Sequence, residues 1–314
     1  MQAIMVSETG GPDVLQVGET DIPRPGPGEV LVRVLAAGVG PWDASLRSGR
    51  LPWQLPVIPG GEFAGVVVGE TGAEAAFEDG EPVYGYPRIT GCYAEYVVCP
   101  SEQMAPIPAG LSNVEAGAVP IDALTAQQGL ADHLGIRSGE TVVITAAAGG
   151  LGHLAVQMAR ALGASVIATA SPRNHEFVHS LGAEAVVDHS QQDWPEQVHA
   201  LTDGGADRIL ACAAPTLAGA AQAARDGAVI ATPVRGEAMP DADRVHWLPY
   251  DGQPRGSGLI ALGPLFDDGT LTVHIARRYF WKDVAAAHRE IENGHTRGKM
   301  VLVVDEDLAA QSGL

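Results

Sequence analysis

Residues 145–177, TAAAGGLGHLAVQMARALGASVIATASPRNHEF, place three glycines between an apolar strand and an apolar helix. The apolar residues of the helix recur at helical spacing, at positions 151, 154, 155, 158 and 162, and Gly163 stands where a C-terminal cap belongs. The three glycines therefore occupy a tight turn that joins a strand to a helix.

The turn reads AAGGLG over residues 147–152, which is the G-x-G-x-x-G pattern with alanine in its first place. Small residues allow the backbone to approach a pyrophosphate, whose charge is favoured by the free N–H groups and the dipole of the helix start. Tight turns also use glycine for purely structural reasons. Because this turn lies within alternating strands and helices, we interpret Gly149, Gly150, Leu151 and Gly152 as a dinucleotide-binding turn.

Strands and helices alternate through the middle of the chain. The apolar strands are expected near residues 141–145, 165–169, 185–187, 207–211 and 228–231. Their spacing leaves room for one helix between each pair, as right-handed crossovers in a parallel sheet require. This pattern predicts an α/β, doubly wound domain over residues 123–258.

The end of the second strand favours one cofactor over another. A site for NAD usually ends this strand with an acid that binds the ribose hydroxyls, but here no acid occurs before Glu176. Ser171, Arg173 and Asn174 offer a hydroxyl, a guanidinium and an amide, which suit the 2′-phosphate of NADPH. The alternative is that Arg173 is a solvated residue in the first turn of the next helix.

The regions on either side of this predicted domain have a different sequence pattern. Residues 1–122 contain short apolar strands broken by Gly and Pro, which predict an all-β, barrel-like unit. Residues 259–314 add one helix, near 281–294, and a final strand, near 298–305, and we expect them to complete the sheet and return to the first domain.

Composition excludes several classes of partner. The formal net charge of −19, from 19 Lys and Arg against 38 Asp and Glu, repels nucleic acid phosphates and anionic lipids. The apolar stretches are too short for a membrane span and the N-terminus lacks the pattern of a signal peptide, so the cytoplasm is the expected location. The three cysteines show no CxxC spacing, which indicates buried thiols and no metal cluster or disulfide framework.

The chain resembles the medium-chain dehydrogenase/reductase superfamily, in particular its zinc-free quinone oxidoreductases (zeta-crystallin-like) and enoyl reductases. The segments that carry the resemblance are GPGEVLVRVLAAGVGPWDASLRSG (26–49), LPVIPGGEFAGVVVGE (55–70), ALTAQQGL (123–130), AAAGGLGHLAVQMARALGASVIATAS (146–171), LGAEAVVDH (181–189) and GHTRGKMVLVV (294–304). The resemblance implies a GroES-like β-barrel catalytic domain beside a Rossmann-type domain, and a homodimer. It also implies NADPH-dependent reduction of a small molecule, either a quinone or a carbon–carbon double bond next to a carbonyl.

Zinc-dependent members of this superfamily have a Cys after the AAG strand and a His in a GHE element. This chain has Gly40 and Pro41 in the first place and GGE, residues 60–62, in the second. A catalytic zinc would lack its thiolate and its imidazole, so no metal is expected. Hydride delivery to a conjugated acceptor needs less help from a Lewis acid than alcohol oxidation does.

The resemblance also implies the cofactor contacts outside the glycine turn. The nicotinamide would lie near Thr125 and a turn at Pro41, Trp42 and Asp43, with His189 near the adenosine and Lys299 in the segment that returns toward the cofactor.

Two polar residues common in the family are replaced, by Gly40 for Asn and by Leu51 for Tyr. We therefore expect water to supply the proton after hydride transfer.

The candidate catalytic residues are Asp43, Thr125 and Tyr86. Asp43 would orient a ribose hydroxyl or a water, with a hydrogen bond to its own turn as the alternative. Tyr86 would donate to a substrate oxygen, with packing in a strand as the alternative. Arg47 is interpreted as the partner of a carboxylate.

Four aromatic residues are expected in loops near the cleft, and we interpret them as a flat apolar pocket for a planar substrate: Trp42, Trp53, Trp247 and Tyr250. The alternative is that they stabilise loops or a dimer interface. The unusual loop at residues 245–256 is a candidate for substrate specificity.

Two other functions remain open. One is a trans-acting enoyl reductase on acyl-carrier thioesters in polyketide or fatty-acid assembly, which a basic docking patch around Arg277, Arg278 and Lys282 would favour. The other is a non-catalytic NADPH-binding protein.

Overall fold

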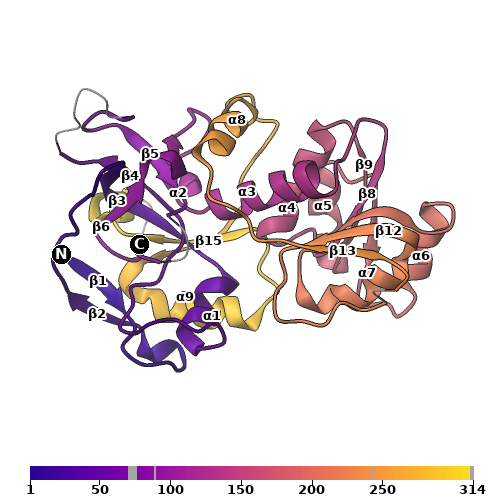
Figure 1. Ribbon diagram of the computed structural model, residues 1–314, viewed down its shortest axis with the longest axis horizontal. Coiled ribbons are helices and arrows are strands. Elements are labelled where there is room, and N and C mark those ends of the chain that lie inside the picture. The colour runs from indigo at the N-terminus through magenta and orange to yellow at the C-terminus, as the bar shows by residue number, and fades with distance from the viewer. Residues whose placement is uncertain (70–75, 88–89, 242, 312–314) are drawn as a thin grey trace. The chain divides into compact units, whose positions relative to one another are not determined.

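The structure is a computed structural model that describes residues 1–69, 76–87, 90–241 and 243–311 (Figure 1). The chain forms two compact units. Unit 1 contains Met1–Ile121 and the chain from Gln253 onward, and unit 2 contains Asp122–Gly252. The sequence placed these two divisions after residues 122 and 258.

Unit 2 contains a six-stranded sheet in which every paired strand is parallel. Its strands are β8 (Thr141–Ile144), β9 (Ser165–Ala170), β10 (Ala185–Asp188), β11 (Ala206–Leu210), β12 (Ala224–Thr232) and β13 (His246–Pro249). They lie in the order β10-β9-β8-β11-β12-β13, which is the 3-2-1-4-5-6 order of doubly wound dinucleotide-binding sheets. The predicted fold class is confirmed, and all five predicted strands are present.

The expectation of a loop at residues 245–256 was wrong, because this stretch contains β13. β13 ends the sheet and pairs with β12, and none of its four residues is fully buried. An exposed edge strand lacks the apolar run by which the inner strands are recognised.

The helices of unit 2 either precede β8 or connect consecutive strands from β8 to β12. They are α3 (Pro120–Gln127), which begins at the boundary of the unit and continues into a π-helix (Gln128–His133), α4 (Gly150–Ala161), α5 (His175–Ser180), α6 (Trp194–Leu201) and α7 (Leu217–Ala223). α4 packs on β8 and β9, α5 on β9 and β10, and α7 on β12 and α6. Every residue of α4 from Leu151 to Ala159 is buried, so this helix is fixed in the core of the unit.

Unit 1 is built around β3 (Glu29–Val39), which pairs with three other strands of a seven-stranded mixed sheet. The other strands are β4 (Phe63–Val67), β5 (Pro82–Gly85), β6 (Tyr96–Pro100), β7 (Met104–Pro106), β14 (Ile275–Phe280) and β15 (Lys299–Val303), and β1 (Gln2–Met5) pairs separately with β2 (Gln16–Glu19). β15 lies antiparallel to β3, with Met300 opposite Val39, so residues from after unit 2 complete this sheet (Figure 1).

The helices of unit 1 are α1 (Pro41–Ser48), α2 (Asn113–Ala116), α8 (Gly256–Asp267), α9 (Val284–Asn293) and α10 (Glu306–Gln311). α1 packs against α9, and α8 packs against β7. In the part of the chain that the structure describes, no helix combines the length and the hydropathy that crossing a bilayer requires.

Candidate cofactor site and active site

The glycine turn joins β8 to α4. Gly149 is the N-cap of α4, and no side chain caps the first N–H groups of the helix. Ala146 has a left-handed backbone, with φ of 50°, and its carbonyl accepts a hydrogen bond from Gly149 N at 3.0 Å. The N-terminus of a buried helix is thereby left open to an anion.

Two positions in the turn require glycine for different physical reasons. A Cβ on Gly152 would lie 2.4 Å from Ala146 O and 2.6 Å from Ala147 Cα, so only glycine allows the helix to pack this closely on the turn. A Cβ on Gly149 would meet one protein atom within 4 Å, Ala146 O at 3.3 Å. The space beside Gly149 is free of other protein atoms, as a cradle for a pyrophosphate requires.

Ser171, Arg173 and Asn174 lie together directly after β9, around a short 3₁₀-helix (Pro172–Asn174). Asn174 is buried, and its Nδ2 donates to Ser171 Oγ at 3.2 Å, while its main-chain N donates to Ser171 O at 2.8 Å. Arg173 is exposed. The strand therefore ends in a hydroxyl, an amide and a guanidinium at the carboxyl edge of the sheet.

The end of β10 lies beside the end of β9, because Asp188 pairs with Ala170. His189 follows in an exposed turn, so the structure brings this predicted adenosine contact to the same edge as Ser171. Asp188 is an acid at this edge that the sequence analysis missed. Hydrogen bonds from Ser190 N and Oγ, at 2.9 and 2.7 Å, lower the pKa of Asp188.

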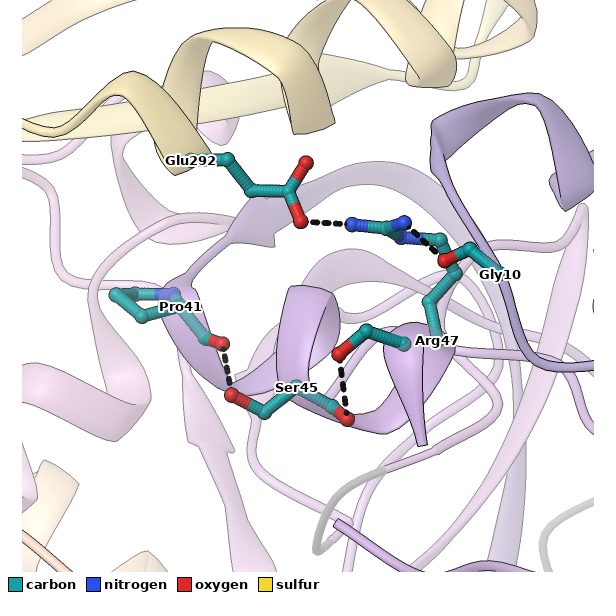
Figure 2. Close-up of polar contacts among 6 residues, drawn as sticks. Gly10, Pro41, Ser45, Arg47 and Glu292 are labelled. Atoms are coloured by element: carbon teal, nitrogen blue, oxygen red, sulfur yellow. Dashed lines mark hydrogen bonds and ion pairs between the residues drawn. The ribbon is translucent and has the colours of Figure 1, made fainter. Parts of the chain in front are cut away.

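In unit 1, residues 41–43 form the first turn of α1 and not an isolated turn. Pro41 occupies a position where its missing N–H leaves no helical bond unmade. Arg47, on the same helix, is 1% exposed, and its guanidinium binds the Glu292 carboxylate on α9 and the Gly10 carbonyl (Figure 2). The interpretation of Arg47 as the partner of a carboxylate is confirmed, and this contact fixes α1 on α9.

Asp43 is buried and accepts hydrogen bonds from three donors. Gly40 N lies 2.9 Å from Oδ2, Gly60 N lies 3.2 Å from Oδ1, and the Tyr93 hydroxyl also binds the carboxylate. Burial raises the pKa of Asp43 to about 6, and the three hydrogen bonds and Lys299 oppose this rise. The contact with Gly40 is the bond to its own turn that we gave as the structural alternative.

Gly60 and Tyr93, which both bind the Asp43 carboxylate, are also in close contact with each other. Gly60 has a φ of 94°, and a Cβ on it would lie 2.4 Å from the Tyr93 ring. The Tyr93 hydroxyl lies 3.3 Å from the Gly38 carbonyl. Sequence reasoning missed Tyr93, because nothing in its local pattern shows that it lies under Gly60.

Lys299 forms a buried ion pair with Glu62, with 3.1 Å between Nζ and Oε1. Glu62 Oε2 also accepts a hydrogen bond from Ile121 N at 2.7 Å. Lys299 was predicted as a cofactor contact, and the structure places its ammonium on a carboxylate within unit 1. Glu62 is the acid of the GGE element, and its role was missed because only the missing histidine was considered.

No group of three or more His, Cys, Asp or Glu side chains suited to a metal ion occurs among the described residues.

Tyr86 and Trp53, both in unit 1, lie outside regular elements. Tyr86 follows β5 and is half-buried, and its main-chain N–H donates to Gln103 O at 3.3 Å. Trp53 follows α1 and is 43% exposed. Their contact with a substrate stays a prediction.

Thr125, Trp247 and Tyr250 belong to unit 2. Thr125 lies on α3 and is buried, and its main-chain carbonyl accepts a hydrogen bond from the Tyr250 hydroxyl at 2.9 Å. Trp247 lies in β13, and its Nε1 donates to Pro240 O at 2.8 Å.

The expectation that the four pocket aromatics lie in loops was therefore wrong for Trp42, which is on α1, and for Trp247. The four are divided between the two units, with Trp42 and Trp53 in unit 1. The contacts of Trp247 and Tyr250 lie within unit 2 and fit the alternative that these residues stabilise loops.

Comparison with protein families gives two matches. Residues 26–109 match a model described as the alcohol dehydrogenase GroES-like domain, and residues 150–233 match one described as zinc-binding dehydrogenase.

Curated relatives match over different lengths. The chain is 32% identical to a probable quinone oxidoreductase of Schizosaccharomyces pombe, over an alignment of 326 positions that covers 98% of each chain. It is 34% identical to the quinone oxidoreductase of Mus musculus over 67% of this chain and 66% of that protein. It is also 34% identical to a spectinabilin polyketide synthase protein of Streptomyces orinoci, over 88% of this chain and 13% of that protein.

Among solved structures, a mycobacterial protein complexed with NADPH is similar. Its TM-score is 0.87 at 29% identity, over 97% of this chain and 100% of that chain.

Proposed function

The chain belongs to the quinone oxidoreductase branch of the medium-chain dehydrogenase/reductase superfamily, and we propose that it transfers a hydride from NADPH to a quinone or an α,β-unsaturated carbonyl compound. The reaction proceeds without a catalytic metal ion. The reduced nicotinamide supplies the hydride when NADPH is bound.

The observation that carries the proposal is the pair of features at the carboxyl edge of the unit 2 sheet. The open N-terminus of α4 follows β8, with space beside Gly149 for a pyrophosphate. Ser171, Arg173 and Asn174 follow the neighbouring strand β9, where an acid would repel a 2′-phosphate. Together they suit NADPH better than NADH.

The proposal of a metal-free reaction rests on the identity of the residues in unit 1. Gly40 and Gly61 stand where zinc-dependent relatives of the resemblance have Cys and His, and glycine offers no side-chain ligand. The nearby Glu62 carboxylate is neutralised by Lys299. A substrate whose double bond is already conjugated with a carbonyl suits such a site, because it needs no Lewis acid.

We assign the proton to water. Asp43 is held by three hydrogen-bond donors, and Gly40 and Leu51 replace the polar residues of the family. The protein contributes mainly by positioning the reactants and excluding bulk water from them.

The function is tested by adding NADPH or NADH with a panel of quinones and enones and following the loss of nicotinamide absorbance. Arg173→Ala should weaken NADPH about 10- to 100-fold, because a charged hydrogen bond is lost, and should leave NADH nearly unchanged. The matched control is Arg225→Ala, an exposed arginine at the opposite end of the sheet, paired with Asp207. Equal weakening of both cofactors by Arg173→Ala would refute the phosphate assignment.

The similarity to a polyketide synthase supports a second candidate, an enoyl reductase that acts on acyl-carrier thioesters. Arg277, Arg278 and Lys282 lie exposed on or next to β14, although Arg277 is paired with Glu290 at 3.3 Å. Turnover of enoyl thioesters but not of free quinones would favour this candidate. Tight NADPH binding with no turnover of any acceptor would favour a non-catalytic protein.

We also propose that the protein is a homodimer, as the resemblance implies. β13 is a terminal strand of the unit 2 sheet, and such edges often pair with a second chain. Sedimentation equilibrium tests this, and a monomer at micromolar concentration would contradict it.

A further inference from the structure

Thr125 lies where two kinds of helix meet. α3 ends at Gln127, and residues Gln128–His133 form a π-helix in which Leu134 N donates to Gly129 O, five residues earlier, at 3.0 Å. Short π-helical segments are uncommon and often occur at functional sites.

One tyrosine ring contacts this helix at three positions spaced by four residues. The Tyr250 hydroxyl donates to the Thr125 carbonyl at 2.9 Å. A Cβ on Gly129 would lie 2.3 Å from the same hydroxyl oxygen, so glycine is needed for the ring to approach. The His133 ring stacks on the Tyr250 ring, with centroids 4.4 Å apart and planes 30° apart.

The residues after Tyr250 contact Thr125 a second time. A Cβ on Gly252 would lie 2.2 Å from Thr125 Oγ1, so the threonine hydroxyl packs directly on the glycine backbone. Between them, Asp251 forms an ion pair with Arg235. Residues 250–252 therefore contact both the main-chain carbonyl and the side-chain hydroxyl of Thr125.

The Tyr250 hydroxyl is a permanent donor. Tyr250 is 6% exposed, and burial, with smaller contributions from Cys212 and Asp122, raises the pKa of its hydroxyl far above the ordinary value. The hydroxyl stays protonated throughout the neutral range, so its bond to Thr125 does not change with pH there. Because the hydroxyl keeps its proton, Tyr250 takes no part in proton transfer at neutral pH.

We propose that Tyr250 is a positioning residue that orients the Thr125 side chain toward the nicotinamide half of the cofactor, by holding the Thr125 carbonyl and placing Gly252 against the threonine hydroxyl. This inference rests on the proposed function and on the resemblance to the family, which implies that the nicotinamide lies near Thr125. Tyr250 itself acts on neither the substrate nor the cofactor. Hydride transfer depends steeply on distance and angle, so a small displacement of Thr125 slows the reaction more than it weakens cofactor binding.

The test is Tyr250→Phe, which removes the hydroxyl and keeps the ring that packs on Gly129 and His133. We expect kcat to fall about tenfold, while the KM of the acceptor changes less than about twofold. The dissociation constant of 2′-phospho-ADP-ribose, which lacks nicotinamide, should stay unchanged, and that of NADPH should rise. In a Thr125→Ala background, Tyr250→Phe should lower kcat no further.

A matched control exists in the other unit. The Tyr84 hydroxyl is also buried and donates to a main-chain carbonyl, that of Leu259, at 3.2 Å. Tyr84→Phe should lower the unfolding temperature about as much as Tyr250→Phe and should leave kcat unchanged.

Two results would overturn the inference alone, provided that the wild-type enzyme binds NADPH and turns over. One is a normal kcat in Tyr250→Phe, and the other is an equal loss of kcat with and without the Thr125 side chain. A wild-type protein that binds neither NADPH nor 2′-phospho-ADP-ribose would overturn the proposed function as well.

Discussion

Lys299 Nζ lies 3.1 Å from Glu62 Oε1, and neither side chain is more than 5% exposed. A Cβ on Gly38 would lie 2.1 Å from the same carboxylate oxygen, so the backbone at Gly38 packs directly against the Glu62 carboxylate. An ion pair in this setting binds β15 to the start of β4 within unit 1.

Lys299→Met should therefore destabilise the protein by about 3–5 kcal/mol, because it leaves the Glu62 carboxylate buried without its cation. Urea unfolding measures the loss, and the double variant with Glu62→Gln should recover part of it. The control is Arg160→Met, which breaks the exposed pair with Glu184 and should cost less than about 1 kcal/mol. Similar losses in the two single variants would contradict the account.

Asp43 makes stability fall as the pH rises. Its pKa in the folded protein is about 6, above the ordinary value of 3.8, so the stability that its proton provides is present below pH 3.8 and lost as the pH rises through 6. The shift corresponds to about 3 kcal/mol. In Asp43→Asn this decrease should disappear from urea unfolding curves measured between pH 4 and 7. An unchanged pH dependence would show that the carboxyl titrates normally.

His288 has the opposite effect. It is fully buried, with its ring edge-on to Tyr93, and neither ring nitrogen has a hydrogen-bond partner among the described residues. Burial, with a smaller contribution from Arg47, lowers the pKa of His288 to about 3. The stability that depends on its neutral form is complete above pH 6.5 and is lost as the pH falls toward 3, by up to about 5 kcal/mol.

His288→Leu should therefore resist acid unfolding better than the wild type, and at pH 7 it should be as stable or slightly more stable, because two unpaired ring nitrogens are removed. Acid titration followed by circular dichroism measures the midpoint. His246→Gln is the control. His246 is exposed on β13, so this substitution should leave the midpoint of acid unfolding unchanged. A midpoint that does not move in His288→Leu would count against the assignment.

Substitutions at two glycines of the turn should affect folding and cofactor binding separately. Gly152→Ala should prevent folding or strongly destabilise unit 2, since its Cβ would lie 2.4 Å from a main-chain oxygen. Gly149→Ala should keep the unfolding temperature within a few degrees and weaken NADPH at least about tenfold, because the methyl group would enter the pyrophosphate space. Thermal unfolding and NADPH fluorescence titration check the pair. Undiminished binding in a folded Gly149→Ala variant would argue against this cradle.

The sequence predicts the parts of the structure that depend on local spacing. The strands of unit 2 and the glycine turn were predicted because apolar periodicity and glycine spacing are contained within about 30 residues. β13 was missed because its exposed residues carry no such pattern. Trp42 was placed in a loop because residues 41–43 were interpreted as a turn, although proline at the first helical position favours a helix start.

The contacts that hold the candidate site were harder to predict, because they join residues far apart in the chain. Glu62 and Lys299 meet only when β15 pairs with β3, and Tyr93 contacts Asp43 only because Gly60 lets its ring approach. The Tyr250–Thr125 bond likewise joins the two ends of unit 2. No local periodicity contains these pairs.

The interruption of unit 1 by unit 2 sets an order on synthesis. A ribosome makes β3 and Glu62 first, then all of unit 2, and only afterwards β14, β15 and Lys299. Unit 2 consists of contiguous residues, and contiguous domains generally fold as units during synthesis. Until β15 is made, β3 lacks one of its partner strands and the Glu62 carboxylate has no Lys299 to pair with. During synthesis there is therefore a stage at which all of unit 2 has been made while the sheet of unit 1 still lacks β14 and β15.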